Sequence, residues 1–234
     1  MPGPTSRQAN LEGAGGAHFF LYVEGPRDED ILKTWVQRIS RPVARDLASR
    51  VVILGGRRPA RAEEHFRSAR GAVSDARGLV VLDRDHHTDW GEGATNEPGL
   101  EIFVWARRHI ESYLMVPSAI RRALGGALDP RVLDQWIAER IPSPEDETAC
   151  RAANAKRLLG SKGELARHLG AGVSPAAVAR AMKLEEFHPD IFSLYERIRE
   201  VSGLGGSAPS PLAPSRSLET SPSRGSTGEL DRGR

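Results

Sequence analysis

The chain has a single cysteine, Cys150, among its 234 residues. One cysteine excludes an intrachain disulfide and a cysteine-rich zinc site, and it suits a reducing compartment. No stretch of about 18 apolar residues occurs, so no membrane-spanning helix is expected. Residues 1–17 are rich in glycine, proline and alanine and lack the apolar core of a secretory signal. We therefore expect a cytoplasmic protein that does not associate with membranes.

The chain also lacks an excess of charge of either sign. Lys and Arg number 33 against 31 Asp and Glu, which gives a formal net charge of +2. This balance argues against a global basic field for nucleic acid, although a local patch of basic residues can still bind it. Neither the phosphate-binding P-loop nor the Rossmann glycine fingerprint occurs. Nucleotide binding through those motifs therefore has no support.

Hydropathy and composition divide the chain into segments. Residues 1–17 are expected to form a flexible leader, and residues 204–234, rich in Ser, Pro and Gly, a disordered tail. The β-α-β order over residues 18–125 predicts a doubly wound α/β core with a mostly parallel four-stranded sheet. Residues 126–203 are expected to be a helical C-terminal extension of the same domain. The strands are predicted from short apolar runs at residues 18–23, 50–54, 78–82 and 100–105, and helices include 145–159 and 162–169.

Two of the predicted strands end in carboxylates. Glu24 follows the first strand and Asp28 comes four residues later, whereas Asp83 and Asp85 follow the third strand. The carboxyl ends of neighbouring parallel strands lie about 5 Å apart, at the edge where open α/β sheets bind their ligands. Clustered carboxylates suit a hard divalent cation such as Mg²⁺. A simpler interpretation stays open for each pair alone: Asp28 can cap its helix, and Asp-x-Asp can be an ordinary pair of loop acids.

Further charged residues are candidates for the same site. Glu111, shortly after the fourth strand, can complete the metal shell or form an ion pair on a helix surface. Lys162, at an expected helix start, can neutralise a developing phosphate charge or remain a solvated surface lysine. The candidates for binding the phosphate backbone of nucleic acid are Arg57, Arg58 and Arg108.

In this order the motifs resemble those of a TOPRIM domain. That family's pattern is a strand ending in Glu-Gly, an Asp four residues after the Glu, and a later strand ending in Asp-x-Asp. Here these motifs are Glu24-Gly25, Asp28 and Asp83-Arg84-Asp85. Over residues 18–203 the resemblance extends to the C-terminal TOPRIM domain of OLD-family (overcoming lysogenization defect) nucleases. There a segment like Trp-x-Arg-Arg-x-Ile-Glu-x-Tyr-Leu follows the fourth strand, as in residues 105–114 here, and a lysine lies further on, for which Lys162 is the candidate.

The resemblance implies a nuclease that depends on Mg²⁺ or Mn²⁺ and cleaves DNA phosphodiester bonds by a two-metal mechanism. It implies Glu24 and Lys162 as catalytic residues, with Lys162 stabilising the transition state. Phage defence and DNA repair are the candidate biological roles. The metal ligands that it implies are Glu24, Asp28, Asp83, Asp85 and Glu111.

The chain departs from OLD proteins in having no Walker motif, the mark of the ATPase domain that precedes their TOPRIM domain. We therefore weigh a stand-alone or split nuclease, served by a separate ATPase subunit, against a non-catalytic TOPRIM-like module that binds nucleic acid or such an ATPase. A phosphatase of the haloacid dehalogenase type, with Asp83 as nucleophile, is disfavoured. Its Asp-x-Asp normally opens the domain and is followed two residues on by Thr or Val, where this chain has His87.

Overall fold

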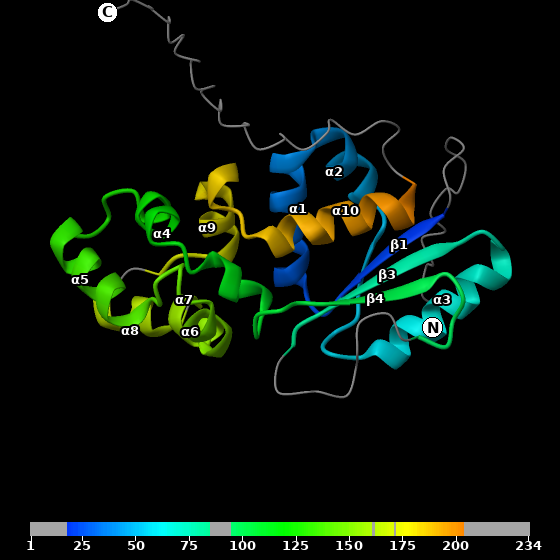
Figure 1. The fold of residues 1–234 in the computed structure, drawn as a ribbon, viewed down its shortest axis with the longest axis horizontal. Helices are drawn as coiled ribbons and strands as arrows, with labels where there is room; N and C mark the ends of the chain where they lie inside the picture. The colour runs from blue at the N-terminus through cyan, green and yellow to red at the C-terminus, as the bar shows by residue number, and fades with distance from the viewer. Residues whose placement is uncertain (1–17, 85–94, 161, 171, 204–234) are drawn as a thin grey trace, which may run out of the picture.

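The sheet has four strands, all parallel. A computed structural model of the chain describes residues 18–84, 95–160, 162–170 and 172–203 (Figure 1). Its strands are β1 (Phe19–Val23), β2 (Val51–Ile53), β3 (Arg77–Leu82) and β4 (Leu100–Val104). They pair in the order β2-β1-β3-β4, and each neighbouring pair is parallel. The predicted α/β core with a four-stranded parallel sheet is confirmed.

Helices cover both faces of this sheet. The first face packs against α1 (Pro26–Ile39), α2 (Arg41–Leu47) and α10 (Pro189–Ser202), and the second against α3 (Pro59–Ala72). Successive strand residues alternate between the two packed clusters: Leu21 and Leu79 belong to the first, Tyr22 and Val80 to the second. Burial on both faces explains why these strands are nearly continuous apolar runs.

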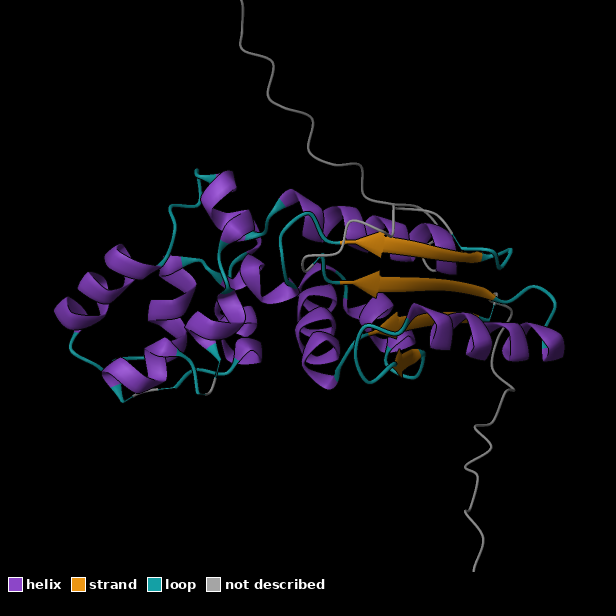
Figure 2. Cartoon of the chain, turned by 90° about the horizontal axis from the view of Figure 1, so that it is seen from below, coloured by secondary structure: helices purple, strands orange, loops and turns teal. Residues whose placement is uncertain are grey.

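A helical region lies beyond the carboxyl ends of the strands (Figure 2). It begins with a 3₁₀ turn, η1 (Ile110–Leu114), and a second 3₁₀ turn, η2 (Leu184–Glu186), precedes α10. Its core is continuous with that of the first sheet face, and α10 returns to pack on the sheet. The helices between the two turns are α4 (Pro117–Leu124), α5 (Pro130–Arg140), α6 (Glu147–Ala152), α7 (Ala155–Leu159), α8 (Glu164–Leu169) and α9 (Pro175–Ala181).

An aromatic cluster joins the sheet to the start of the helical region. Trp35 on α1, Trp105 directly after β4, and Tyr113 on η1 are each 1% exposed. The Trp35 and Trp105 ring centroids are 6.1 Å apart in an edge-to-face arrangement, and those of Trp105 and Tyr113 are 4.8 Å apart. Such contacts add to the stabilisation from burial. They hold η1 in a defined position against the carboxyl edge of the sheet.

Local capping makes some helix boundaries differ from the prediction. From the sequence, Pro42 is expected to end the helix that follows the first strand, but it lies in the first turn of α2, which Ser40 caps, and so begins a second helix. The helix predicted over residues 145–159 is two helices, α6 and α7. Asn154 separates them because its side chain accepts a hydrogen bond from the Arg157 N–H (3.1 Å) and so caps α7.

Some predictions concern residues outside the described ranges. They include the flexible leader (1–17), the disordered tail (204–234), Asp85 and His87. Within the described residues, no helix combines the length and the apolar character needed to cross a membrane.

Candidate active site

The ends of β1 and β3 meet at the carboxyl edge of the sheet. Glu24 and Asp83 are the first residues after these strands. The Glu24 carboxylate (Oε1) accepts a hydrogen bond from the Asp83 backbone N–H at 2.9 Å. Parallel pairing of β1 with β3 brings these residues together, 59 positions apart in the sequence.

The Asp83 side chain is buried and held from two sides. It is 4% exposed. Its Oδ1 accepts a hydrogen bond from the Ile110 backbone N–H at 2.8 Å, and its Oδ2 accepts one from the Lys156 ammonium at 2.6 Å. The first contact ties the strand end to η1, and the second ties it to α7. The Asp83 side chain therefore links the end of β3 to both η1 and α7 of the helical region.

Glu111 on η1 is still more deeply buried, at 1% exposed. Its Oε1 lies 3.3 Å from Arg27 Nη1, and its Oε2 lies 3.8 Å from Lys156 Nζ. Among the described residues this Oε2 has no hydrogen-bond partner. Burial raises the pKa of the Glu111 carboxyl, and Asp83 adds to the rise against the opposing effect of Lys156. Glu111 therefore belongs to the buried cluster of acids and does not form an ion pair on a helix surface.

Asp28 both caps a helix and belongs to the cluster. Its Oδ2 accepts a hydrogen bond from the Gly25 backbone N–H at 2.7 Å, at the start of α1. Burial raises the pKa of Asp28 to about 7, and the charges of Asp83 and Glu111 contribute, while the Gly25 N–H and Lys156 act in the opposite direction. The capping interpretation and the cluster interpretation therefore describe the same side chain.

The lysine beside these acids is Lys156, on α7, and not Lys162. Lys162 lies before α8 with an exposed side chain, and none of its contacts within the described residues reaches the acids. Burial lowers the pKa of the Lys156 ammonium, but Asp83 and Glu111 outweigh burial and raise it above the ordinary value. Asn154 caps the start of α7 and separates it from α6, which places Lys156 in the first turn of a separate short helix.

Arginines surround the cluster. Arg57 donates a hydrogen bond to the main-chain carbonyl of Asp83, and its Nη1 lies 3.9 Å from Glu24 Oε1. Arg58 is exposed at the start of α3, and Arg108 is partly buried between β4 and η1. Arg27 was not among the predicted site residues, yet it contacts Glu111 and its side chain is 48% exposed. Of the predicted arginines, Arg57 contacts both Glu24 and Asp83.

The donor atoms of the site suit a divalent cation, but their present arrangement does not hold one. As they stand, no three Asp, Glu, His or Cys side chains of the described residues are arranged to hold one metal ion. The Lys156 ammonium lies between Asp83 and Glu111. However, all the convergent donors are carboxylate oxygens, Glu111 Oε2 is buried without a hydrogen-bond donor, and Asp28 has a raised pKa. These are the properties of a cluster with unbalanced negative charge, and such a donor set fits Mg²⁺ or Mn²⁺.

Fold and site together define an open α/β domain of the Rossmann type, in which acids after β1 and β3 meet at the carboxyl edge of a parallel sheet. The chain is similar in structure to the C-terminal region of the Xanthomonas campestris pv. campestris OLD protein, with 16% identity, a TM-score of 0.46, and coverage of 80% of this chain and 95% of that one. It is similar also to the C-terminal region of the Burkholderia pseudomallei OLD protein, with 17% identity, a TM-score of 0.41, and coverage of 80% and 98%.

Both matches are to the group of proteins that the motifs resemble. No family model and no curated protein matches the chain. At such low identity the likeness is one of overall structure, so the roles of individual residues have to come from the side chains of this chain.

Proposed function

We propose that this protein is a metal-dependent nuclease that cleaves DNA phosphodiester bonds at the acid cluster. The observation that carries the proposal is the convergence of Asp28, Asp83 and Glu111 around Lys156, with the Glu24 carboxylate bonded to the Asp83 backbone, at the edge of the sheet where α/β folds bind ligands. These carboxylates come from four separate elements. Burial raises the pKa of Asp28 and of Glu111, and a bound cation would offset the cost of ionising them.

The residues that would hold Mg²⁺ or Mn²⁺ are Glu24, Asp28, Asp83 and Glu111, together with Asp85, which lies outside the described residues. When bound, the metal would polarise the phosphate and lower the pKa of an attacking water, with two ions serving the attacking and leaving oxygens.

The chain's own residues supply the remaining chemistry. Lys156 stays protonated at neutral pH because the acids raise its pKa. Its ammonium would move from Asp83 Oδ2 to a non-bridging phosphate oxygen and stabilise the charge that develops there. Glu24 would accept the proton of the attacking water. Arg27 and Arg57 lie beside the acids, where their guanidinium groups would orient the phosphodiester.

Arg58 and Arg108 extend the basic residues around this edge and would bind phosphates on either side of the cleaved bond. Phage defence and DNA repair are the biological roles proposed for such an activity, and the proposed location is the cytoplasm.

Plasmid nicking in the presence of Mg²⁺ or Mn²⁺ tests the proposal. Asp83→Asn and Glu24→Gln keep the side-chain shape and remove the charge, so they are expected to lower the rate at least 100-fold. Glu139→Gln is the matched control because Glu139 is exposed on α5, far along the chain from the acids, and accepts a hydrogen bond from Gln135. Thermal unfolding of each variant establishes that it is folded. Equal rates in all four proteins, or no cleavage of any DNA by the wild type, would refute the proposal.

One observation favours a second candidate, a non-catalytic TOPRIM-like module that binds nucleic acid or a separate ATPase subunit. Lys156 already pairs with Asp83 at 2.6 Å, as in a purely structural ion pair. The two candidates differ in turnover. Stable DNA binding without cleavage under any metal, with co-purification of an ATPase, would favour the module.

A further inference from the structure

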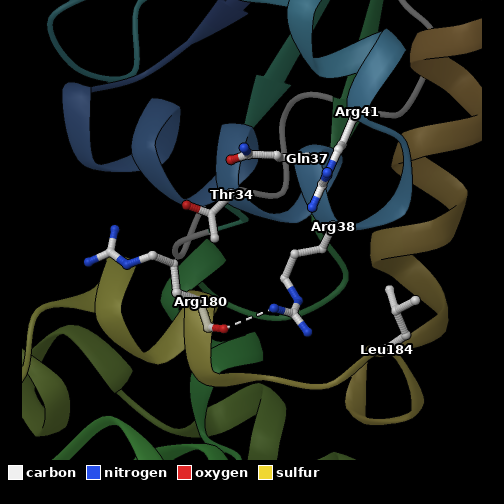
Figure 3. Close-up of a pocket in the computed structure, with 6 residues that line it drawn as sticks. All are labelled: Thr34, Gln37, Arg38, Arg41, Arg180 and Leu184. Carbon is white, nitrogen blue, oxygen red and sulfur yellow. Dashed lines mark hydrogen bonds between the residues drawn. The ribbon is translucent and has the colours of Figure 1, made fainter.

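A basic groove lies between α1 and α9 (Figure 3). Its volume is about 490 Å³. Three arginines contribute to its walls: Arg38 on α1, Arg41 at the start of α2, and Arg180 on α9. The other lining residues are Thr34, Gln37 and Leu184. Every polar side chain of this lining can donate hydrogen bonds, and none is acidic.

Among the described residues, the arginines of the groove are not engaged in ion pairs, unlike several others on the surface. Arg67, Arg121 and Arg197, for example, each form an ion pair with an acidic side chain. In the part of the chain that the structure describes, Arg41 and Arg180 have no acidic partner. Arg38 donates a hydrogen bond to the Arg180 main-chain carbonyl at 3.1 Å (Figure 3), which orients its guanidinium without neutralising it. Like charges gathered in this way repel one another, and a bound anion would remove that cost.

The groove shares its elements with the acid cluster. Helix α1 carries Asp28 in its first turn and Arg38 in its last, ten residues further on. At 1.5 Å per residue the two positions lie about 15 Å apart along the helix. Helix α9, which carries Arg180, packs against both α1 and η1, and η1 carries Glu111. Rigid elements therefore set the distance between groove and cluster.

We propose that Arg38, Arg41 and Arg180 bind a backbone phosphate of the DNA substrate, flanking the bond that is cut. The inference rests on the proposed nuclease function and adds a second contact point to it. Duplex DNA advances 3.4 Å per base pair, so the separation of about 15 Å along α1 corresponds to four or five base pairs. Guanidinium groups match the geometry of phosphate oxygens, and contacts of this type carry no sequence preference.

The test is DNA binding by the full chain, measured by fluorescence anisotropy with a labelled duplex in Ca²⁺ over a series of salt concentrations. The groove variant is Arg41→Ala with Arg180→Ala, which leaves the Arg38 anchor in place. The control is Arg131→Ala with Arg167→Ala, which removes the same charge from α5 and α8, where neither side chain has an acidic partner within the described ranges. Thermal unfolding confirms that both variants are folded.

We expect the groove variant to bind about tenfold more weakly than wild type, with a salt dependence lower by one to two ion equivalents, whereas the control changes by less than twofold. Equal affinity and salt slope in the two variants would overturn the inference. Inorganic pyrophosphate provides a second arm. If pyrophosphate stabilises wild type but not the groove variant, and DNA binding is the same in both, the groove binds a free phosphate compound and the DNA assignment is wrong.

Failure of this inference is distinguishable from failure of the proposed function. If the groove variant binds DNA more weakly but the wild type never cleaves DNA with Mg²⁺ or Mn²⁺, the groove proposal is supported and the nuclease proposal is refuted. If the wild type cleaves DNA and the groove variant binds it as well as the wild type does, the nuclease proposal is supported and the groove proposal is refuted.

Discussion

Replacing Lys156 with methionine is expected to destabilise the metal-free protein and to abolish cleavage. The substitution keeps the unbranched apolar part of the side chain and removes the ammonium 2.6 Å from Asp83 Oδ2 and 3.8 Å from Glu111 Oε2. It leaves two carboxylates, 4% and 1% exposed, without their shared cation. Removing one partner of a buried pair costs about 3–5 kcal/mol. Because the Lys156 side chain is 39% exposed and solvent screens its charge, we expect about 2 kcal/mol at pH 8.

This loss should depend on pH in a defined direction. Burial raises the pKa of Glu111, and Lys156 opposes that rise. Without Lys156 the pKa of Glu111 moves further up, so ionisation costs stability from the unfolded-state pKa upward. The destabilisation of Lys156→Met is therefore largest at pH 8 and becomes smaller as the pH falls and Glu111 takes up a proton. Mg²⁺ should stabilise the variant more than wild type, because the cluster has gained one negative charge.

Urea unfolding at pH 5 and pH 8, with and without Mg²⁺, measures these effects, and plasmid nicking measures the activity. Lys162→Met is the matched control: the side chain is exposed, and we expect its change in stability to stay within about 0.5 kcal/mol with cleavage unaffected. If Lys162→Met abolished cleavage while Lys156→Met remained active and stable, the placement of the lysine given by the structure would be refuted.

Three further outcomes are expected. Asp28→Asn should stabilise the metal-free protein at pH 8 by about 1–3 kcal/mol relative to its effect at pH 4, because a pKa raised to about 7 makes ionisation of Asp28 unfavourable in the folded state. Urea unfolding at the two pH values measures this difference, and an effect independent of pH would contradict it. Trp105→Ala should cost about 3–5 kcal/mol in urea unfolding, since the ring is 1% exposed and packs on Trp35 and Tyr113; a loss below about 1 kcal/mol would show that the aromatic cluster does not hold η1. Arg27→Met should leave stability within about 1 kcal/mol but weaken DNA binding in anisotropy titrations, because this half-exposed guanidinium lies at Glu111; unchanged binding would remove Arg27 from the site.

Much of the fold could be predicted from short-range patterns. The apolar runs of β1 and β3 are buried on both faces, so their sequences carry the signal of a parallel sheet without alternation. Glu24 and Asp83 were recognisable because each directly follows such a run. Helix boundaries were less predictable. The side-chain cap of Asn154 divides residues 145–159, and a single hydrogen bond of this kind is decided by local geometry that hydropathy does not record.

The partners of the acids could not be predicted in the same way. Arg27 meets Glu111 across 84 positions of the sequence, and Lys156 meets Asp83 across 73. Lys162, six residues further along the chain, has the same side chain but does not contact the acids within the described residues. No local pattern distinguishes these two lysines, because the difference between them comes from the packing of α7 against η1.

The amino-acid sequence alone was enough to infer the succession of strands along the chain, the acids that follow them and the even balance of charge. The first two depend on neighbouring residues, and the third depends on composition. Which cation neutralises which acid, how far the pKa of Asp28 rises, and where unpaired arginines gather are different in kind. Electrostatic energy depends on distance in space and on burial, and both arise only when the sheet, η1, α7 and α9 pack together. The tertiary structure therefore decided the lysine of the site and the basic groove beside α1.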